Sequence, residues 1–197
     1  MRANPPEHRH PRRLDRSRDV DWIEDFLRRG AVTVLAAVAD SKPLCLPRLF
    51  AYDAERYALY LHGARGGELL EALEEHREQG DGRAPVAATV FQMGRLLPAP
   101  EAAEFSVEFG SVVVAGRGVV VEDPDEAMHG LRLLMEKYAP HLEPGKEYRD
   151  MAPEEVARTS VIRVDIQAWS GKEKTEAGEF PGAYWYRDVA GRKKDFS

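Results

Sequence analysis

The chain has 197 residues, of which 43% are hydrophobic and 31% are charged, and its formal net charge is -6. This composition is typical of one soluble globular domain with extensions, and it indicates neither a fibre nor a disordered chain. The net acidity argues against a general nucleic-acid surface, and the longest apolar run, residues 31–39, has about half the length of a membrane-spanning helix. We therefore expect no nucleic-acid partner and no membrane partner.

Residues 1–18 are locally basic, with arginines at positions 9, 12, 13, 16 and 18. We expect this N-terminal arm to be a solvated tail or to lie on a partner. No apolar segment follows its positive charges, as a secretory signal would require. The single cysteine, Cys45, cannot form an internal disulfide, which fits a reducing compartment. The predicted localisation is cytoplasmic.

The first half of the chain predicts a helix followed by three strands. Asp19 can cap the helix and Gly30 can end it. Two apolar runs, residues 31–39 and 44–51, are separated by the turn-rich tetrapeptide DSKP, which favours a hairpin. After a turn at 52–56, residues 57–61 form the third strand.

The second half predicts three more strands, and Gly116 with Gly118 would bend or bulge the longest of them. Asp123 can cap a further helix. Six strands with few helices favour an antiparallel barrel over a parallel sheet, which needs a helical crossover after nearly every strand. We predict a mainly β fold, a six-stranded antiparallel split barrel with flanking helices over residues 19–170, and a C-terminal extension at 171–197. The remaining elements are strands at 85–91, 111–122 and 161–169, a loop at 93–104 and a helical stripe at 127–138.

The segment LYLHGARGGELLEAL, residues 59–73, carries the clearest functional signal. A short strand ends in His62, a glycine-rich bend follows, and a helix opens at Gly66, Gly67 or Glu68. Free backbone N–H groups at a helix start can bind an anion such as a phosphate, which predicts one end of a cofactor site. Glycines near a helix end also serve purely conformational needs, so this alternative stays open.

Three further segments extend this signal: WIEDFLRRGAVTVLA, FSVEFGSVVVAGRGVVVEDPDEA and TSVIRVDIQAWSGKE. In the same order, these segments and LYLHGARGGELLEAL resemble the nitroimidazole-resistance (Nim) branch of the pyridoxamine 5'-phosphate oxidase-like flavoproteins, over roughly residues 20–173. The resemblance implies a split barrel that binds FMN and forms a homodimer with the cofactor at the subunit interface. It also implies a flavin-dependent oxidoreductase that reduces small acceptors of the nitro-aromatic kind.

The resemblance implies that His62 lines the flavin pocket, where an imidazole can supply a proton near neutral pH. Each implied site residue has a structural alternative as a turn residue, a core side chain or a solvated charge. Glu68 departs from relatives that have Arg or Lys there, and Phe109 with Gly110 replaces Tyr and a polar residue. The implied cofactor-binding residues are Arg48, Leu49, Phe50, His62, Gly63, Ala64, Gly66, Gly67, Leu69, Ser111, Val112, Trp169 and Lys172.

Two other functions stay open. The first is a module of the same fold that has lost flavin or holds haem, because Glu68 disfavours a phosphate and His62 can ligate iron. The second is a dimeric barrel with a purely structural role. The scattered histidines and the absence of a paired Cys motif predict no structural metal.

Overall fold

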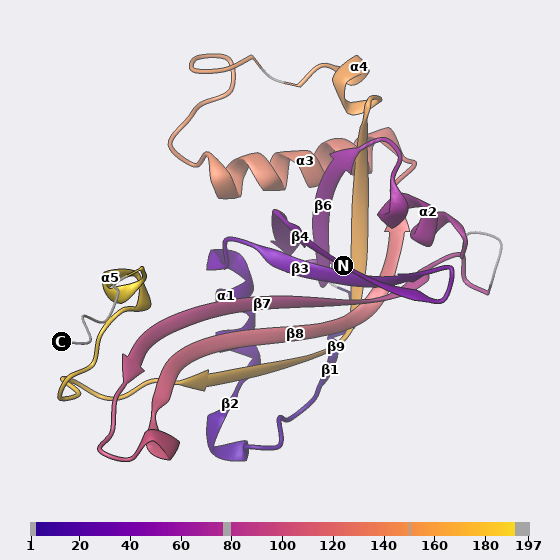
Figure 1. The fold of residues 1–197 in the computed structure, drawn as a ribbon. Coiled ribbons are helices and arrows are strands. Elements are labelled where there is room, and N and C mark those ends of the chain that lie inside the picture. Colours follow the sequence, from indigo (N-terminus) through magenta and orange to yellow (C-terminus); the bar gives the residue numbers. More distant parts are fainter. Residues whose placement is uncertain (1–2, 77–79, 150, 192–197) are drawn as a thin grey trace.

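The computed structural model describes residues 3–76, 80–149 and 151–191, and the nine strands in these ranges belong to one sheet (Figure 1). The main path of this sheet has the order β4-β3-β7-β8-β9-β6-β5, and all neighbours along it are antiparallel. Two short strands, β1 and β2, pair with β9. The bounds are β1 Glu7–His8, β2 Ser17–Arg18, β3 Thr33–Ala39, β4 Lys42–Arg48, β5 Phe50–Asp53, β6 Ala58–Ala64, β7 Ala84–Leu97, β8 Ser106–Val120 and β9 Thr159–Lys174. The predicted mainly β fold class is confirmed.

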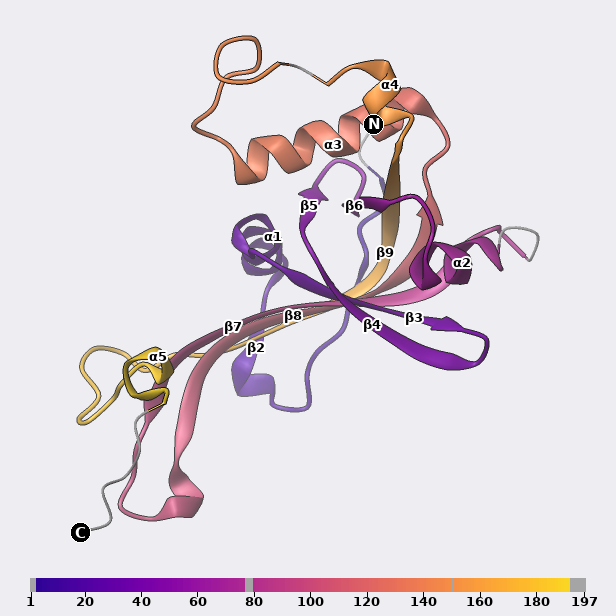
Figure 2. The same ribbon diagram turned by 45° about the horizontal axis from the view of Figure 1, so that its top comes forward.

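Strands β7, β8 and β9 are long and curved, and together they form an arm that extends away from the barrel (Figures 1 and 2). Gly116 lies where the register between β8 and β9 shifts, as predicted. A Cβ at Gly116 would lie 2.4 Å from the carbonyl oxygen of Asp165, so the strands approach here more closely than a side chain allows.

Two amphipathic helices cover the sheet. Helix α1, Val20–Arg29, begins where the Trp22 N–H donates to Asp19 Oδ1 (2.9 Å) and ends at Gly30. Helix α3, Pro124–Tyr138, begins where the Glu126 N–H donates to Asp123 Oδ1 (2.8 Å). Both caps agree with the sequence prediction. The short helices are η1 Leu14–Arg16, α2 Glu68–Glu74, η2 Ala102–Glu104, α4 Pro153–Val156 and α5 Tyr186–Val189.

The side chains form two hydrophobic cores. The larger one fills the barrel and extends under α1, and Trp169, 1% exposed, lies within it against the edge of Tyr57. The smaller one lies between α3 and the β5–β6 pair, at the top of Figures 1 and 2, and contains the fully buried Tyr60. Burial of one large apolar side chain contributes about 1.5–3 kcal/mol, so each helix is held mainly by its buried face. No helix within the described ranges is both long and apolar enough to cross a membrane.

The predicted strand 44–51 is wrong as a single element. Strand β4 ends at Arg48 and β5 begins at Phe50, and these two strands lie at opposite edges of the sheet. The chain leaves one edge and joins the other at Leu49, which raises the main strand count from six to seven. Apolar residues continue through this junction, so periodicity gives no sign of the break.

The predicted loop at 93–104 is also shorter than expected. Strand β7 continues to Leu97 and β8 begins at Ser106, because the two strands pair again after an irregularity at Met93/Leu96. Arg95 and Glu108 join the strands at this end through an ion pair of 2.7 Å. Pro98 and Pro100 indicated a loop, and in the structure they lie just beyond the end of β7.

Residues 3–18 of the N-terminal arm are not a free tail. Strand β1 pairs in parallel with Ala168 and Trp169, and β2 pairs with Gly171 and Lys172, so the arm lies along β9 of its own chain. Arg18 Nε donates to Glu173 (2.9 Å) and fastens this contact. The expected boundary at residue 170 falls inside β9, which continues to Lys174.

Candidate functional site

A hollow of about 230 Å³ lies where β4, the end of β6 and the start of α2 meet. Besides the predicted residues, it is lined by Leu46, Glu68, Leu70 and Ile162. Topology explains the grouping, because β4 is an edge strand and its inward row faces β6 across the opening of the barrel. The predicted residues that the structure gathers here are Arg48, His62, Gly63, Ala64, Gly66, Gly67 and Leu69.

The bend between β6 and α2 depends on two glycines. Gly66 and Gly67 have φ values of 93° and 100°, which favour a residue without a Cβ. A Cβ on either glycine would meet no atom within 4 Å, so both present open backbone toward the hollow. No side chain caps α2 at Gly67. Because α2 has only seven residues, its dipole is small and an anion here would depend mainly on a side-chain cation.

Arg48 is the cation best placed for this role. Among the described residues its guanidinium makes no hydrogen bond or ion pair, although it is only partly exposed. His62 is exposed in the same hollow and likewise has no protein partner in the described ranges. A guanidinium can bind a phosphate or carboxylate with two parallel hydrogen bonds. Glu68 brings an opposing carboxylate to the same hollow.

Three predicted residues, Leu49, Ser111 and Lys172, lie outside the hollow. Leu49 is 44% exposed and follows Arg48 directly. Ser111 and Lys172 are paired across β8 and β9, and Lys172 Nζ lies 4.9 Å from the centroid of the Phe109 ring. As cofactor contacts, these three residues remain predictions.

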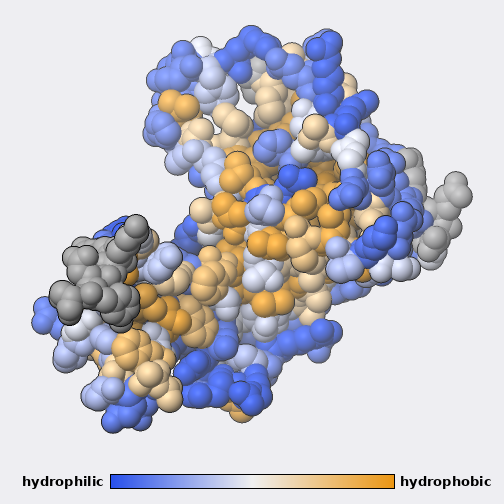
Figure 3. Space-filling view, viewed as in Figure 1, coloured by the Kyte–Doolittle hydropathy of each residue, from blue (hydrophilic) through white to orange (hydrophobic). Residues whose placement is uncertain are grey.

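Leu49 and Ser111 border an apolar surface, which we name the outer face. It is the side of the sheet opposite the barrel interior, and apolar residues gather over β3 and β4 in the middle of Figure 3. Its members are directly exposed to solvent, at 42–58% of their maximal area, and they come from three adjacent strands. They are Val34 and Val38 of β3, Phe91 of β7 and Val113 of β8.

The last three predicted residues lie in the core of the chain. Phe50 and Val112 are 0% exposed and Trp169 is 1% exposed. Their side chains pack in the larger hydrophobic core and do not line the hollow. A direct contact between these three residues and a cofactor remains a prediction.

Lys137 and Tyr138 of α3 form a clamp behind Phe50 that was not predicted from the sequence. The Phe50 N–H donates to Tyr138 Oη (3.1 Å), and that hydroxyl donates to the carbonyl of Ala31 (2.6 Å). Lys137 Nζ lies 3.5 Å from the centroid of the Phe50 ring and donates to the carbonyl of Leu27 (3.2 Å). Burial lowers the pKa of Lys137 to about 8. The clamp therefore fixes the junction that follows Arg48.

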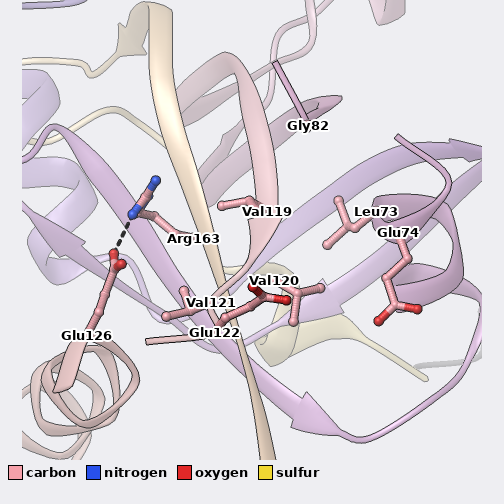
Figure 4. A pocket seen from close by; sticks show the side chains of 9 residues that line it. All are labelled: Leu73, Glu74, Gly82, Val119, Val120, Val121, Glu122, Glu126 and Arg163. Carbon is pink, nitrogen blue, oxygen red and sulfur yellow. Dashed lines mark hydrogen bonds and ion pairs between the residues drawn. The ribbon is translucent and has the colours of Figure 1, made fainter. Parts of the chain in front are cut away.

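A second hollow, of about 290 Å³, lies between α2, the end of β8 and β9 (Figure 4). Arg163 Nη1 donates to Glu126 Oε1 at its wall (2.5 Å), and Arg163 Nε lies 2.8 Å from Asp165 Oδ1. Burial raises the pKa of the neighbouring Tyr60 to about 12, so its hydroxyl stays protonated and donates to Glu126 (2.8 Å). The charge of Arg163 is thus already compensated within the protein, and no other cation lines this hollow among the residues that the structure describes.

The main path of seven antiparallel strands, its open edges at β4 and β5, and the glycine bend that lies next to β4 at the end of β6 define a split-barrel protein. The model of the pyridoxamine 5'-phosphate oxidase family matches residues 19–173, and the chain belongs to this family. The family predicted from the sequence is confirmed. No curated protein matches the chain.

Several solved structures share the fold. The flavocytochrome Anf3 from Azotobacter vinelandii has 23% identity and a TM-score of 0.68, with 84% of this chain and 72% of that chain covered. An FAD and haem binding protein from Mycobacterium smegmatis has 24% identity and a TM-score of 0.68, with 87% and 77% covered. A candidate 5-nitroimidazole antibiotic resistance protein from Bacteroides thetaiotaomicron has 20% identity and a TM-score of 0.62, with 79% and 84% covered.

Proposed function

We propose that this protein is a homodimeric flavoprotein that binds FMN at the hollow between β4, β6 and α2 and passes electrons to small acceptors such as nitro-aromatic compounds. The observation that carries the proposal is the guanidinium of Arg48, which has no partner among the described residues and shares this hollow with the exposed His62 and the open glycine bend. Family membership supports it, and so do the solved structures of similar fold that are described as flavin-binding.

The residues present fit a flavin in two respects. Arg48 and the backbone at Gly66 and Gly67 suit a phosphate, since a guanidinium and open N–H groups are its usual partners. Leu69 and Ile162 supply apolar surface for flat rings. The carboxylate of Glu68 repels a phosphate, so the attraction from Arg48 has to exceed this repulsion.

Two observations support the homodimer: the size of the hollow and the exposed outer face. Ligand pockets usually enclose about 300–1,000 Å³, and 230 Å³ falls below this range. One chain therefore supplies only part of a cofactor site. The exposed outer face adjoins the site at Leu49, which directly follows Arg48, and an exposed apolar surface of this kind is typical of an interface. We infer that a second copy covers the outer face and completes the site.

When bound, the flavin would supply the redox chemistry. In this proposal Arg48 holds the phosphate end, and the clamp of Lys137 and Tyr138 keeps Arg48 in place through the neighbouring backbone. The apolar wall excludes water from the rings. His62, exposed at the hollow, donates a proton to the reduced acceptor.

The first experiment is the absorbance spectrum of the protein as isolated, followed by titration with FMN, FAD and riboflavin. FMN is expected to bind and to raise the melting temperature. Arg48→Ala should weaken FMN binding about 10- to 100-fold, because it removes a charge-assisted contact of about 1.5–3 kcal/mol, and should leave riboflavin binding unchanged. Arg12→Ala, at another exposed arginine, is the matched control. A protein that stays colourless with FMN and keeps its melting temperature would rule the proposal out.

The catalytic part is tested separately. The bound flavin is reduced anaerobically with dithionite and mixed with a nitroimidazole, and its reoxidation is followed by absorbance. We expect His62→Ala to slow reoxidation by about 10²-fold or more while FMN affinity changes little. Equal rates in the two proteins would exclude His62 as the proton donor.

A haem-binding module of the same fold is the second candidate. His62 is an exposed imidazole without a protein partner in the described ranges, and Glu68 disfavours a phosphate in the same hollow. Two similar structures are described as a flavocytochrome and as an FAD and haem binding protein. A Soret band that is lost in His62→Ala would favour this candidate over FMN.

A further inference from the structure

A third hollow lies between α3 and the residues that follow this helix. Residues 139–149 leave the end of α3 and run back over the helix, at the top of Figures 1 and 2. The hollow beneath them encloses about 490 Å³, compared with about 230 Å³ at Arg48. Small-molecule sites usually enclose about 300–1,000 Å³, so this hollow alone is large enough for a ligand.

One face of α3 forms the floor of the hollow. The floor residues are spaced i, i+3, i+4 and i+7, so they lie on the same side of the helix. They are Arg132, Met135, Glu136 and Ala139. The α3 residues at positions 127, 131 and 134 are buried in the smaller core instead. Helix α3 therefore packs one face on the sheet and turns a second face toward the hollow.

The loop above the helix is held in shape by its own hydrogen bonds. The Gly145 N–H donates to the carbonyl of Tyr148 (2.7 Å), and the Glu143 N–H donates to Glu147 Oε2 (2.8 Å). Leu142 and Tyr148 line the hollow from this loop, and both residues are partly buried. The loop is therefore a formed wall that stands away from the helix.

Most of the lining is apolar. Met135 contributes from α3, Met151 from the residue pair before α4, and Leu142 with the Tyr148 ring from the loop. Methionine is flexible and polarizable, so it adapts to ligands of irregular shape. This composition suits a ligand with an extended apolar part.

The charges in the hollow favour a cation. Glu136 is exposed, and among the described residues its carboxylate makes no hydrogen bond or ion pair. Arg132, the other charged residue of the lining, already interacts within the protein. Residues 135–158 contain six carboxylates and four lysines or arginines, so the surrounding segment is acidic as well. A positively charged group of a ligand would find its partner in Glu136.

We propose that the hollow between α3 and residues 139–149 binds a hydrophobic amine. The apolar part of the ligand packs against Met135, Leu142 and Tyr148, and its ammonium group pairs with Glu136. This inference does not depend on the proposed function, because the two hollows share no residue.

The first experiment tests the class of ligand. Octylamine, 1-octanol and octanoate have the same chain length and differ in charge at pH 7. Isothermal titration of the wild-type protein should give the highest affinity for octylamine and the lowest for octanoate. The expected ratio between octylamine and 1-octanol is about threefold to fivefold, because an ion pair with an exposed carboxylate is weak. Octanoate that binds as tightly as octylamine, or no binding of octylamine, would overturn the inference.

The second experiment tests the location. Leu142→Trp places a larger side chain in the hollow and should weaken octylamine binding at least about tenfold. His141→Trp adds the same ring at the neighbouring exposed position, outside the lining, and should bind octylamine within about twofold of the wild type. Melting curves without ligand show that both variants are folded. Unchanged affinity in a folded Leu142→Trp variant would overturn the inference.

The third experiment tests the charge and does not alter the packing. Glu136→Gln should remove the preference for octylamine over 1-octanol, and it should fold normally because this side chain is exposed. Glu154→Gln, at an exposed carboxylate of the same segment that does not line the hollow, should keep the preference. A preference that survives in Glu136→Gln would contradict the pairing with this carboxylate.

FMN titration of the wild-type protein separates this inference from the proposed function. If the protein binds FMN and no octylamine, only the inference falls. If it binds octylamine and no FMN, only the proposed function falls.

Discussion

The ion pair between Glu108 and Arg95 holds the end of the β7–β8 arm, and its removal gives a sharp test of how the arm is stabilised. Glu108 is 6% exposed, and its carboxylate accepts hydrogen bonds from Arg95 Nε (2.8 Å), Arg95 Nη2 (2.7 Å) and the backbone N–H of Arg95 (3.2 Å). It also accepts from the backbone N–H of Glu176 (3.0 Å), which fixes the C-terminal segment. We predict that Glu108→Gln weakens both contacts.

The expected cost follows from this geometry. Glutamine keeps the size of the side chain, but its NH₂ group replaces one of the two oxygens that now face donors. At least one donor then loses its acceptor, and the partly exposed charge of Arg95 loses its compensation. Such a loss costs about 2–3 kcal/mol of unfolding free energy. The matched control is Glu104→Gln, an exposed residue of the same arm, which should change stability by less than about 0.5 kcal/mol.

The pH dependence of the difference gives a second check. Hydrogen bonding to Arg95 lowers the pKa of Glu108 to about 2, from an ordinary value of 4.5. A carboxyl with a lowered folded-state pKa stabilises the protein fully above the unfolded value and loses this contribution as pH falls toward the folded value. Urea unfolding of both proteins should therefore give a difference that is largest at pH 7 and smaller at pH 3. Equal differences at the two pH values would refute the electrostatic reasoning.

Three further predictions concern other parts of the fold. Lys137→Met should raise the unfolding free energy by about 1 kcal/mol at pH 7, because burial of the charged lysine destabilises the folded protein and lowers its pKa to about 8. Solvent screening and the contact with the Phe50 ring offset part of this destabilisation. The wild-type protein loses this destabilisation as the pH rises from 8 to 10.5, where the lysine is neutral in both the folded and the unfolded state. The stability difference between Lys137→Met and the wild type should therefore disappear near pH 10.5, and a difference that grows with pH would contradict the prediction. Gly116→Ala should cost about 1–3 kcal/mol in urea unfolding because its Cβ would lie 2.4 Å from a backbone oxygen, whereas Gly63→Ala, whose Cβ meets nothing within 4 Å, should be nearly neutral. Tyr138→Phe should weaken FMN binding in a fluorescence titration about threefold to tenfold without affecting riboflavin, since it loosens the junction behind the phosphate-binding arginine, and equal losses for both ligands would exclude that route.

The sequence specified the local signals of the fold well. The caps at Asp19 and Asp123 and the glycine in the bulge at Gly116 depend on neighbouring residues alone, and all three were predicted. Two features depend on contacts between distant segments and were missed. The break at Leu49 takes the chain from one edge of the sheet to the other, and the N-terminal strands at 7–8 and 17–18 pair with β9 more than a hundred residues away.

In the candidate site, too, local features were predicted and contacts between distant segments were missed. Residues of the bend, such as His62, Gly66 and Gly67, were predicted from one continuous segment, and the structure gathers them with Arg48 in one hollow. The contribution of Tyr138 was not predicted, because a tyrosine on the buried stripe of a helix reads as packing alone. Only the fold shows that its hydroxyl reaches the backbone of a strand junction.

Exposure separates two kinds of residue within the implied flavin site. The side chains of Arg48 and His62 reach the surface of the hollow, whereas Val112 and Trp169 are 0% and 1% exposed within this chain, so a contact between the latter two and a cofactor stays a prediction. Trp169 pairs through its backbone with β1 and packs beside Tyr57. A resemblance in sequence assigns all of these residues to one site because it compares positions along the chain. The structure divides them into exposed residues that line the hollow and buried residues that pack behind it. We expect substitutions of the first kind to change ligand affinity at constant stability, and substitutions of the second kind to change both.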